Sequence, residues 1–338
     1  MIKTITICGG GSIGHAIAGV WGSKENVIVN ILSNRAEQWE KTITVIDNTN
    51  KVYCGNINCC TSSPELVIPQ SDIVLLCVPG FLIEQTLKNI VPYLSPQTYV
   101  GACVGSSGFF FTAENVLNSC QPLFAFQRVP YIARVCEYGK SGRILGHKAC
   151  LNIGFKNLED ISFLQLLQTN LETPVKKLDS YYDAAFSNSN PILHPSRLYG
   201  LWHDWTEGMF YDEQILFYES WDDFSSEILI ACDNDFFNVI RHYPCSQNGI
   251  PRLLDYYESS NAHQLSQKLK SIKAFKGIFA PMKKTSQGFI PDWDDRYFKE
   301  DIPFGMQIIK NMALKVSQKT PAIDQILHWY KQHTEIIS

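Results

Sequence analysis

The fold of this chain is decided by the stretch Ile5-Thr6-Ile7-Cys8-Gly9-Gly10-Gly11-Ser12-Ile13-Gly14. Its first four residues predict a buried strand, and the pattern G-x-G-x-x-G follows directly, at the start of a helix expected over residues 12–21. In such a loop the first glycine permits a tight turn, the second leaves room for a pyrophosphate, and the third lets the helix pack closely on the strand. The N–H groups of the helix N-terminus then favour phosphate. We therefore expect a dinucleotide to bind at Gly9, Gly11, Ser12, Ile13 and Gly14.

The residues that follow the second expected strand, 26–32, indicate which dinucleotide binds. NAD-binding domains usually carry Asp or Glu at this point, because a carboxylate accepts hydrogen bonds from the ribose hydroxyls. This chain has Ser33, Asn34 and Arg35 instead. No carboxylate would repel a 2′-phosphate there, and Arg35 could pair with one. The prediction is NADP in preference to NAD, the alternative being that Arg35 is a solvated residue at a helix start.

A third cofactor contact is expected where another strand ends. Residues 72–78 contain six consecutive apolar residues, followed by Pro79 and Gly80. In an open α/β sheet, ligands bind outside the carboxyl ends of the strands. Val78 and Pro79 are therefore expected to contact the cofactor.

The pattern along the chain indicates an α/β domain followed by a mostly helical one. In the first half, apolar strands alternate with helices, and a hairpin is expected around the polar turn 47–50. This alternation predicts a parallel sheet covered on both faces. After about residue 179 helical patterns dominate, at 196–211, 225–243, 249–257, 302–316 and 321–333. The predicted fold is a Rossmann-type domain over residues 1–180 and a helical substrate domain over residues 181–338.

Composition narrows the class of protein. A chain of 338 residues with 45% hydrophobic and 18% charged residues is typical of a globular protein of two domains. The net charge of −4 gives no electrostatic reason to expect nucleic acid or an anionic membrane as partner. The longest apolar run, 73–83, is shorter than the roughly 20 residues of a membrane span, and a signal-peptide layout is absent. We expect a soluble, cytoplasmic protein.

The cysteines predict neither a disulfide framework nor a metal site. There are 11 of them, an odd number, and no C-x-x-C pair occurs. Reduced thiols are the expectation for such a pattern. No metal is expected, because the ligand spacing of structural zinc sites is absent.

Two polar motifs stand far apart in the second half. The first is Asn188-Ser189-Asn190-Pro191-Ile192-Leu193-His194-Pro195, and the second is Arg296-Tyr297-Phe298-Lys299-Glu300-Asp301-Ile302-Pro303-Phe304-Gly305. Taken alone, a histidine before proline can be structural, and the charged tract 292–301 can be a solvated loop. In their order and separation, and together with the N-terminal loop, the motifs resemble the octopine/opine dehydrogenase family. The resemblance extends from Ile2 to about Ile308, and residues 127–134 share it more loosely.

The resemblance implies a reaction and the residues that perform it. Members of that family condense an α-keto acid with the amine of an amino acid and reduce the imine with NAD(P)H to a secondary amine. Carried over, His194 and Asp301 transfer the proton and Arg296 holds the keto-acid carboxylate. Histidine titrates near neutral pH, and a carboxylate on its other ring nitrogen fixes the tautomer. An arginine fork binds a carboxylate at two points. Asn190 is expected to orient the substrate or to bond the nicotinamide amide.

Two other functions stay open at this point. A 2-hydroxyacid or ketone reductase of the ketopantoate-reductase type shares the scaffold, but such enzymes typically use a lysine, and the pairs 176–177 and 283–284 look like solvated charge. A catalytically silent NADP-binding sensor is the third hypothesis, and the intact set of His194, Asp301 and Arg296 argues against it. The expected partners are small-molecule substrates, an α-keto acid and an amino acid. A homodimer is expected only from the frequency of such oligomers.

Overall fold

The computed structural model describes residues 3–246 and 249–334. Contacts within the chain divide it into two compact units, one ending at Ser187 and the other beginning at Asn188. The division falls slightly after the boundary expected at residue 180. The short helix α5 (Tyr181–Ala185) belongs to the first unit, because it packs against strand β10. Each unit is described by itself below.

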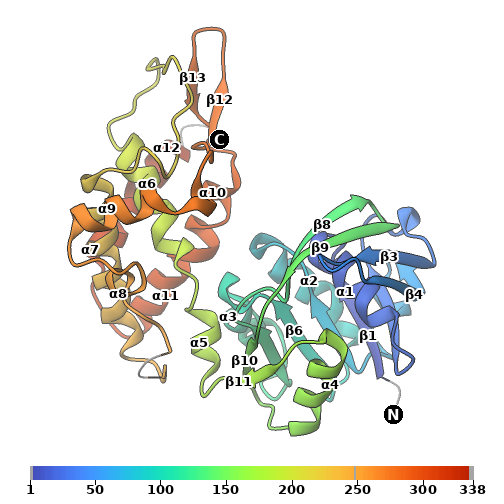
Figure 1. The fold of residues 1–338 in the computed structure, drawn as a ribbon. Helices are drawn as coiled ribbons and strands as arrows, with labels where there is room; N and C mark the ends of the chain where they lie inside the picture. The colour runs from blue at the N-terminus through green and yellow to red at the C-terminus, as the bar shows by residue number, and fades with distance from the viewer. Residues whose placement is uncertain (1–2, 247–248, 335–338) are drawn as a thin grey trace. The chain divides into compact units, whose positions relative to one another are not determined.

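The centre of the first unit is a parallel sheet of Rossmann type (Figure 1). Its strands run in the order β7-β6-β5-β1-β2-β4, and every neighbouring pair among them is parallel. The strand order reverses at β1, which has β2 on one side and β5 on the other. The expected parallel sheet is confirmed. The bounds are β1 Lys3–Cys8, β2 Val27–Leu32, β4 Val52–Thr61, β5 Ile73–Leu76, β6 Tyr99–Cys103 and β7 Leu123–Phe126.

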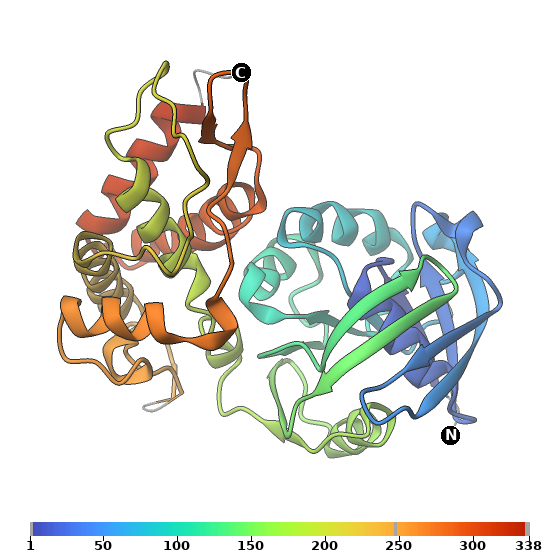
Figure 2. The ribbon, with the colours of Figure 1, turned by 45° about the horizontal axis from the view of Figure 1, so that its top comes forward.

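Further strands extend this sheet at both edges. β3 (Thr42–Ile46) pairs antiparallel with β4 and forms the expected hairpin around residues 47–50. Beyond β3 lies an antiparallel hairpin of β8 (Tyr131–Glu137) and β9 (Ser141–His147), with β9 parallel to β3 (Figure 2). The other edge is made by β10 (Leu151–Lys156) and β11 (Val175–Lys177). The sequence did not predict these last four strands.

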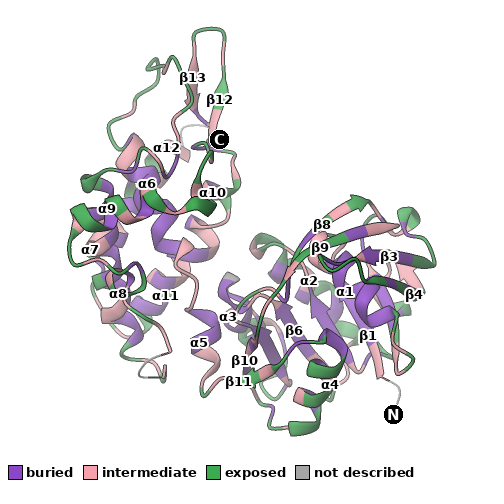
Figure 3. Cartoon of the chain, viewed as in Figure 1, coloured by how far each residue is buried: buried purple, intermediate pink, exposed green. Residues whose placement is uncertain are grey.

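Helices cover both faces of the sheet, as Figure 3 shows by the burial of its central strands. In β5 alternate residues enter different cores: Ile73 and Leu75 join the core under α1 and α4, whereas Val74 and Leu76 join the core under α2 and α3. This accounts for the unbroken apolar run in the sequence. The helices are α1 Ser12–Gly22, α2 Gly80–Ile90, α3 Phe109–Val116 and α4 Ile161–Leu171, with short turns η1 Ala36–Gln38, η2 Pro64–Leu66, η3 Val91–Tyr93 and η4 Gly105–Ser107.

The second unit is mostly helical, as expected. Helix α7 (Asp223–Ile240) packs against α6, α9, α11 and α12 and forms the centre of the unit. A small antiparallel hairpin, β12 and β13, was not expected. The other bounds are α6 Asn190–Trp202, α8 Leu253–Tyr256, α9 Ala262–Ser271, η5 Lys273–Phe275, β12 Met282–Lys284, β13 Phe289–Pro291, α10 Arg296–Lys299, η6 Ile302–Met306, α11 Gln307–Lys315 and α12 Pro321–Thr334.

The first helix of this unit corrects the sequence-based expectation. A helix was expected over residues 196–211, with the preceding motif as a polar segment. Helix α6 instead begins at Asn190 and ends at Trp202, so that His194 lies within it. Pro191 fits the first turn of a helix because the N–H groups there have no helical acceptor. Residues 203–222 form a loop rather than a helix, and within it Tyr211 pairs its backbone with Phe289.

Among the residues that the structure describes, no helix has both the length and the apolar character needed to span a bilayer.

Candidate functional site

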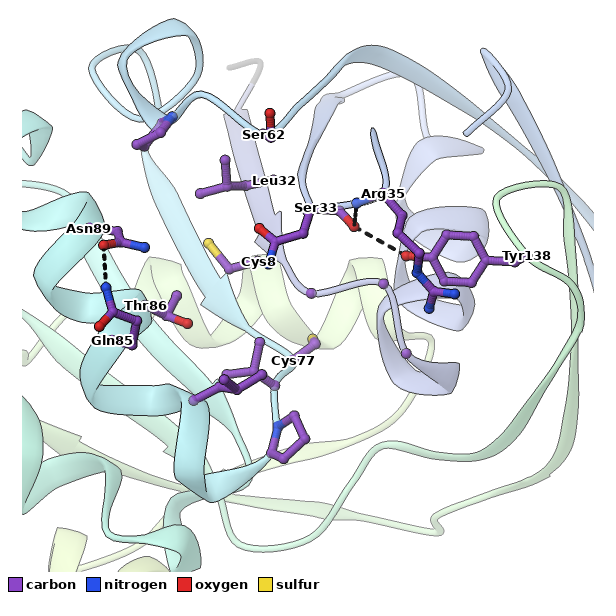
Figure 4. A pocket seen from close by; sticks show the side chains of 18 residues that line it. Cys8, Leu32, Ser33, Arg35, Ser62, Cys77, Gln85, Thr86, Asn89 and Tyr138 are labelled. Atoms are coloured by element: carbon purple, nitrogen blue, oxygen red, sulfur yellow. Dashed lines mark hydrogen bonds between the residues drawn. The ribbon is translucent and has the colours of Figure 1, made fainter. Parts of the chain in front are cut away.

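A pocket of about 360 Å³ lies at the carboxyl ends of β1, β2, β4 and β5, where the strand order reverses (Figure 4). This is the place where open α/β sheets bind their ligands. Of the residues predicted to bind cofactor, those that line it are Gly9, Gly11, Ser33, Asn34, Arg35, Val78 and Pro79. Ser12, Ile13 and Gly14 do not line this pocket, but they form the first turn of α1 beside it.

The phosphate loop has the backbone that its glycines were expected to allow. Gly9 has φ +111°, and a Cβ there would lie 2.7 Å from the Cys77 carbonyl oxygen. A Cβ on Gly14 would clash with the Gly9 carbonyl oxygen, so only glycine lets α1 approach β1 this closely. A Cβ on Gly11 would meet no atom within 4 Å. Gly11 therefore leaves open space beside the N-terminus of α1, and this cradle fits a pyrophosphate.

The end of β2 carries the charge that bears on cofactor choice. Arg35 is exposed, and its guanidinium carbon lies 3.7 Å from the centre of the Tyr138 ring. The Ser33 hydroxyl accepts the backbone N–H of Arg35 at 3.2 Å and lies 3.1 Å from the Tyr138 hydroxyl. The lining of this pocket contains no Asp or Glu, and Arg35 is its charged residue.

The second unit brings the two distant motifs together. The Nδ1 atom of His194, in α6, lies 2.7 Å from Oδ2 of Asp301, the residue before η6. The two elements pack closely, because Gly305 has no side chain where it meets Pro191: a Cβ there would lie 2.9 Å from the Pro191 Cβ. The proline of the first motif and the glycine of the second therefore help to place His194 against Asp301.

The neighbours of the imidazole define its tautomer. Because a carboxylate only accepts, Nδ1 of His194 carries the hydrogen and donates it to Asp301. The Nε2 atom then accepts from the hydroxyl of Tyr218, at 2.9 Å. The Tyr297 ring lies 4.3 Å from the imidazole, centre to centre. His194 is buried and held on three sides.

The phenol of Tyr218 is kept in its protonated form, in which it can donate a hydrogen bond. Burial raises the pKa of its phenol well above the usual range, and the nearby Tyr297, Tyr257 and Asp301 raise it further. Its ring stacks on Phe275 at 4.0 Å between centres. The hydroxyl therefore stays protonated at neutral pH.

Arg197, one turn after His194 in α6, holds the segment that carries Tyr218. Its side chain is fully buried. The Nε atom donates to the Phe217 carbonyl at 3.0 Å, and the two Nη atoms donate to Asp222 at 2.9 Å and to the Ser220 carbonyl at 2.7 Å. The loop after residue 203 is thereby fixed to α6 beside the dyad.

Arg296 and Asn190 lie in the same unit as the dyad. Arg296 is the first residue of α10, is exposed, and directly precedes the tyrosine that packs on the imidazole. Burial raises the pKa of Glu300, and the positive charge of Arg296 lowers it in part. Asn190 stands four residues before His194 in α6, so the two share one face of the helix.

Three residues of these sites were missed in the sequence: Tyr138, Arg197 and Tyr218. None belongs to a motif, and each is brought to its site by contacts with residues far away in the sequence. Local sequence offered no signal for the contact of Tyr138 with the phosphate loop, 105 residues from its Ser33 partner. Nothing in the local sequence around Tyr218 indicated a contact with His194.

Together, a Rossmann-type dinucleotide pocket and a buried histidine paired with an aspartate in a helical unit define a two-domain NAD(P)-dependent dehydrogenase. Residues 177–334 match the family model for the α-helical domain of NAD/NADP octopine/nopaline dehydrogenases, and residues 4–105 match that of the coenzyme F420-dependent NADP oxidoreductases. The helical unit therefore matches the octopine/nopaline dehydrogenase family, and the chain is similar to octopine and opine dehydrogenases over nearly its whole length. The resemblance seen in the sequence and the expected enzyme class, an NAD(P)-dependent oxidoreductase, are confirmed.

Relatives cover nearly the whole chain. Octopine dehydrogenase of Pecten maximus is 27% identical, over 98% of this chain and 90% of its own. Tauropine dehydrogenase of Arabella iricolor is 28% identical, over 96% of this chain and 90% of its own. A solved structure of octopine dehydrogenase with NADH and L-arginine has a TM-score of 0.87 at 25% identity, over 98% and 90%. The expected fold class is confirmed by this similarity.

Proposed function

We propose that this enzyme condenses an α-keto acid with the amine of an amino acid and reduces the resulting imine to a secondary amine. The observation that carries the proposal is the buried His194 with its Nδ1 atom 2.7 Å from the half-buried Asp301, in a helical unit that matches the octopine/nopaline dehydrogenase family. Structures of octopine dehydrogenase with L-arginine and with pyruvate, at 25% and 26% identity, support the two substrate classes.

The proposed chemistry uses each residue for one task. Attack of the amine on the keto carbon gives a carbinolamine, whose hydroxyl leaves as water once it has gained a proton. His194 takes a proton from the incoming ammonium group and gives it to that hydroxyl, and Asp301 stabilises the imidazolium that exists in between. Arg296 binds the keto-acid carboxylate, and Asn190 orients the substrate. The dinucleotide, held by Gly9, Gly11 and the end of β2, supplies the hydride.

The alternative functions find less support. The lysines considered for a ketopantoate-reductase type of reaction lie at 176–177 in the edge strand β11 and at 283–284 in β12, and all four are exposed. The likeness to a ketopantoate reductase, with a TM-score of 0.64 at 13% identity, shows the fold alone. A silent sensor would not need a buried histidine with a fixed tautomer.

A substrate matrix tests the proposed reaction. Oxidation of NADPH and NADH is followed with α-keto acids against amino acids and other amines, and with each partner alone. Oxidation that requires both partners supports the proposal, and the best pair names the substrates. Oxidation with the keto acid alone would assign a hydroxyacid dehydrogenase, and binding of cofactor without any turnover would favour the sensor.

We propose further that NADP is preferred over NAD, because Arg35 is the charged residue of the pocket lining and no carboxylate lines it. Arg35→Ala is expected to raise the Kd of NADPH by roughly 10-fold or more, since hydrogen bonds to charged groups contribute about 1.5–3 kcal/mol. The Kd of NADH should stay within about twofold. Titration calorimetry measures both, with the exposed Arg143→Ala as the matched control. Equal loss for the two cofactors would contradict the preference.

Tyr218 is proposed as a positioning residue for His194. In Tyr218→Phe the Nε2 atom loses its donor, so kcat is expected to fall about 3- to 10-fold, the value of one hydrogen bond, with the Kd of NADPH unchanged. Steady-state kinetics give the result. The matched control is Tyr199→Phe, which removes a phenol that accepts from Gln325 at 2.7 Å rather than one on the imidazole. A kcat equal in the two variants would remove Tyr218 from the mechanism.

The cytoplasmic location and the homodimer stay predictions, the first from the sequence and the second from the frequency of two-fold oligomers.

A further inference from the structure

The tip of the β8–β9 hairpin lies in the dinucleotide pocket. Tyr138 is one of the pocket's lining residues, and its hydroxyl sits so close to the phosphate loop that a Cβ on Gly10 would clash with it. The next residue, Gly139, has φ +72°, and a Cβ there would lie 2.8 Å from the Cα of Trp39. The tip therefore fits tightly between the phosphate loop and the segment after β2.

His15 joins this tip to the phosphate loop. Its buried ring lies with Nδ1 3.1 Å from the Gly11 carbonyl oxygen, and Nε2 accepts the Gly139 N–H at 2.7 Å. A carbonyl only accepts, so Nδ1 carries the hydrogen and Nε2 is free to accept. Burial lowers the pKa of His15 and the charge of Arg35 lowers it further, while the hydrogen bonds to Gly11 and Gly10 oppose this. The neutral tautomer thus fixes the hairpin tip beside the loop.

The fixed tip holds the charge of the pocket in place. The Tyr138 ring packs against His15, with 5.0 Å between centres, and its face meets the Arg35 guanidinium at 3.7 Å. Its hydroxyl lies 3.1 Å from that of Ser33 (Figure 4). A cation on a ring face is attracted to it, and a side chain ordered before binding loses less entropy when the ligand arrives.

We propose that Tyr138 is a specificity-determining residue for the adenosine half of the cofactor. Its ring orients the Arg35 guanidinium, beside the Ser33 hydroxyl, toward a phosphate monoester on the 2′ position of the ribose. The selected ligand class is a nucleotide with that phosphate. This inference rests on the proposed preference for NADP over NAD, and it names Tyr138 as the residue that orients Arg35 for that preference.

The test compares binding of NADPH and NADH to the full chain by titration calorimetry. Tyr138→Leu keeps bulk against His15 but removes the aromatic face, whereas Tyr138→Phe keeps the face. We expect Tyr138→Leu to raise the Kd of NADPH about 3- to 10-fold and the Kd of NADH less than twofold, in line with the strength of cation–π interactions. In Tyr138→Phe the Kd of both cofactors should stay within about twofold of its normal value. Glu137→Ala, an exposed change in the same hairpin, is the control for a general effect of altering it.

A double variant shows whether Tyr138 acts through Arg35. In the Arg35→Ala background, Tyr138→Leu should cause no further loss of NADPH affinity. Equal weakening of both cofactors, a loss in Tyr138→Phe as large as in Tyr138→Leu, or additive losses in the double variant would overturn the inference. If Arg35→Ala itself leaves the NADPH to NADH ratio unchanged, the cofactor preference fails. If Arg35→Ala changes the ratio and Tyr138→Leu does not, only the role of Tyr138 fails.

Discussion

His194→Ala lowers kcat by roughly 10²- to 10⁴-fold, the usual contribution of a positioned acid–base group, and leaves the Kd of NADPH within about twofold of its normal value. The reason is that the imidazole lies with Asp301 in the helical unit, whereas the dinucleotide pocket is formed within the other unit. Steady-state kinetics on the best substrate pair and calorimetric titration of the cofactor measure the two effects.

Two further variants separate the dyad from a general disturbance of α6. Asp301→Asn keeps the shape of the carboxylate but no longer favours the donating Nδ1, so a loss similar to that of His194→Ala is expected. His203→Ala removes a histidine just after the same helix, where its Nδ1 atom lies 3.2 Å from the Tyr199 carbonyl oxygen and its ring packs against Phe224, and it should leave kcat unchanged. Turnover that persists in His194→Ala would end the proposed role of the dyad.

Arg197→Leu is expected to lower the free energy of unfolding of the helical unit by about 3–5 kcal/mol. The guanidinium is fully buried, and its removal leaves the Phe217 and Ser220 carbonyl oxygens without their donors. Because the same bonds fix the segment with Tyr218, kcat should fall as well. Urea unfolding followed by tryptophan fluorescence gives the free energy.

The control for this prediction is Arg241→Leu, an exposed arginine just after α7, where a change within about 0.5 kcal/mol is expected. Arg197→Lys keeps the charge but offers one nitrogen instead of three. Its loss of unfolding free energy should therefore lie between those of Arg197→Leu and Arg241→Leu. If Arg197→Leu lowers the free energy of unfolding by less than about 1 kcal/mol, water or neighbouring groups replace the hydrogen bonds of the guanidinium, which would contradict the prediction.

The cofactor pocket could be predicted from the sequence wherever its residues follow a strand. Gly9, Gly11, Arg35 and Pro79 each stand at the carboxyl end of a strand that the apolar pattern marks. Parallel pairing places these ends at one edge without further information. Tyr138 could not be found in this way, because it arrives on an edge hairpin whose position depends on pairing between β9 and β3.

The dyad could be predicted only because two motifs carry the family resemblance. Nothing in the local pattern says that His194 meets Asp301, 107 residues further along. The helix that carries His194 was expected to begin only at residue 196, because the motif before it, which contains Pro191 and Pro195, was interpreted as a polar segment. Arg197 was missed for another reason: an arginine in a helical pattern is usually solvated, and its burial depends on a loop that was itself expected to be helix.

The most direct test of the account is the mass of the product formed from an α-keto acid, an ¹⁵N-labelled amino acid and NADPH that carries deuterium at the transferable hydride position. The proposed reaction gives one molecule that contains the keto-acid carbons, the labelled nitrogen and one deuterium. A deuterated hydroxyacid without the labelled nitrogen, formed equally well when the amino acid is omitted, would contradict it.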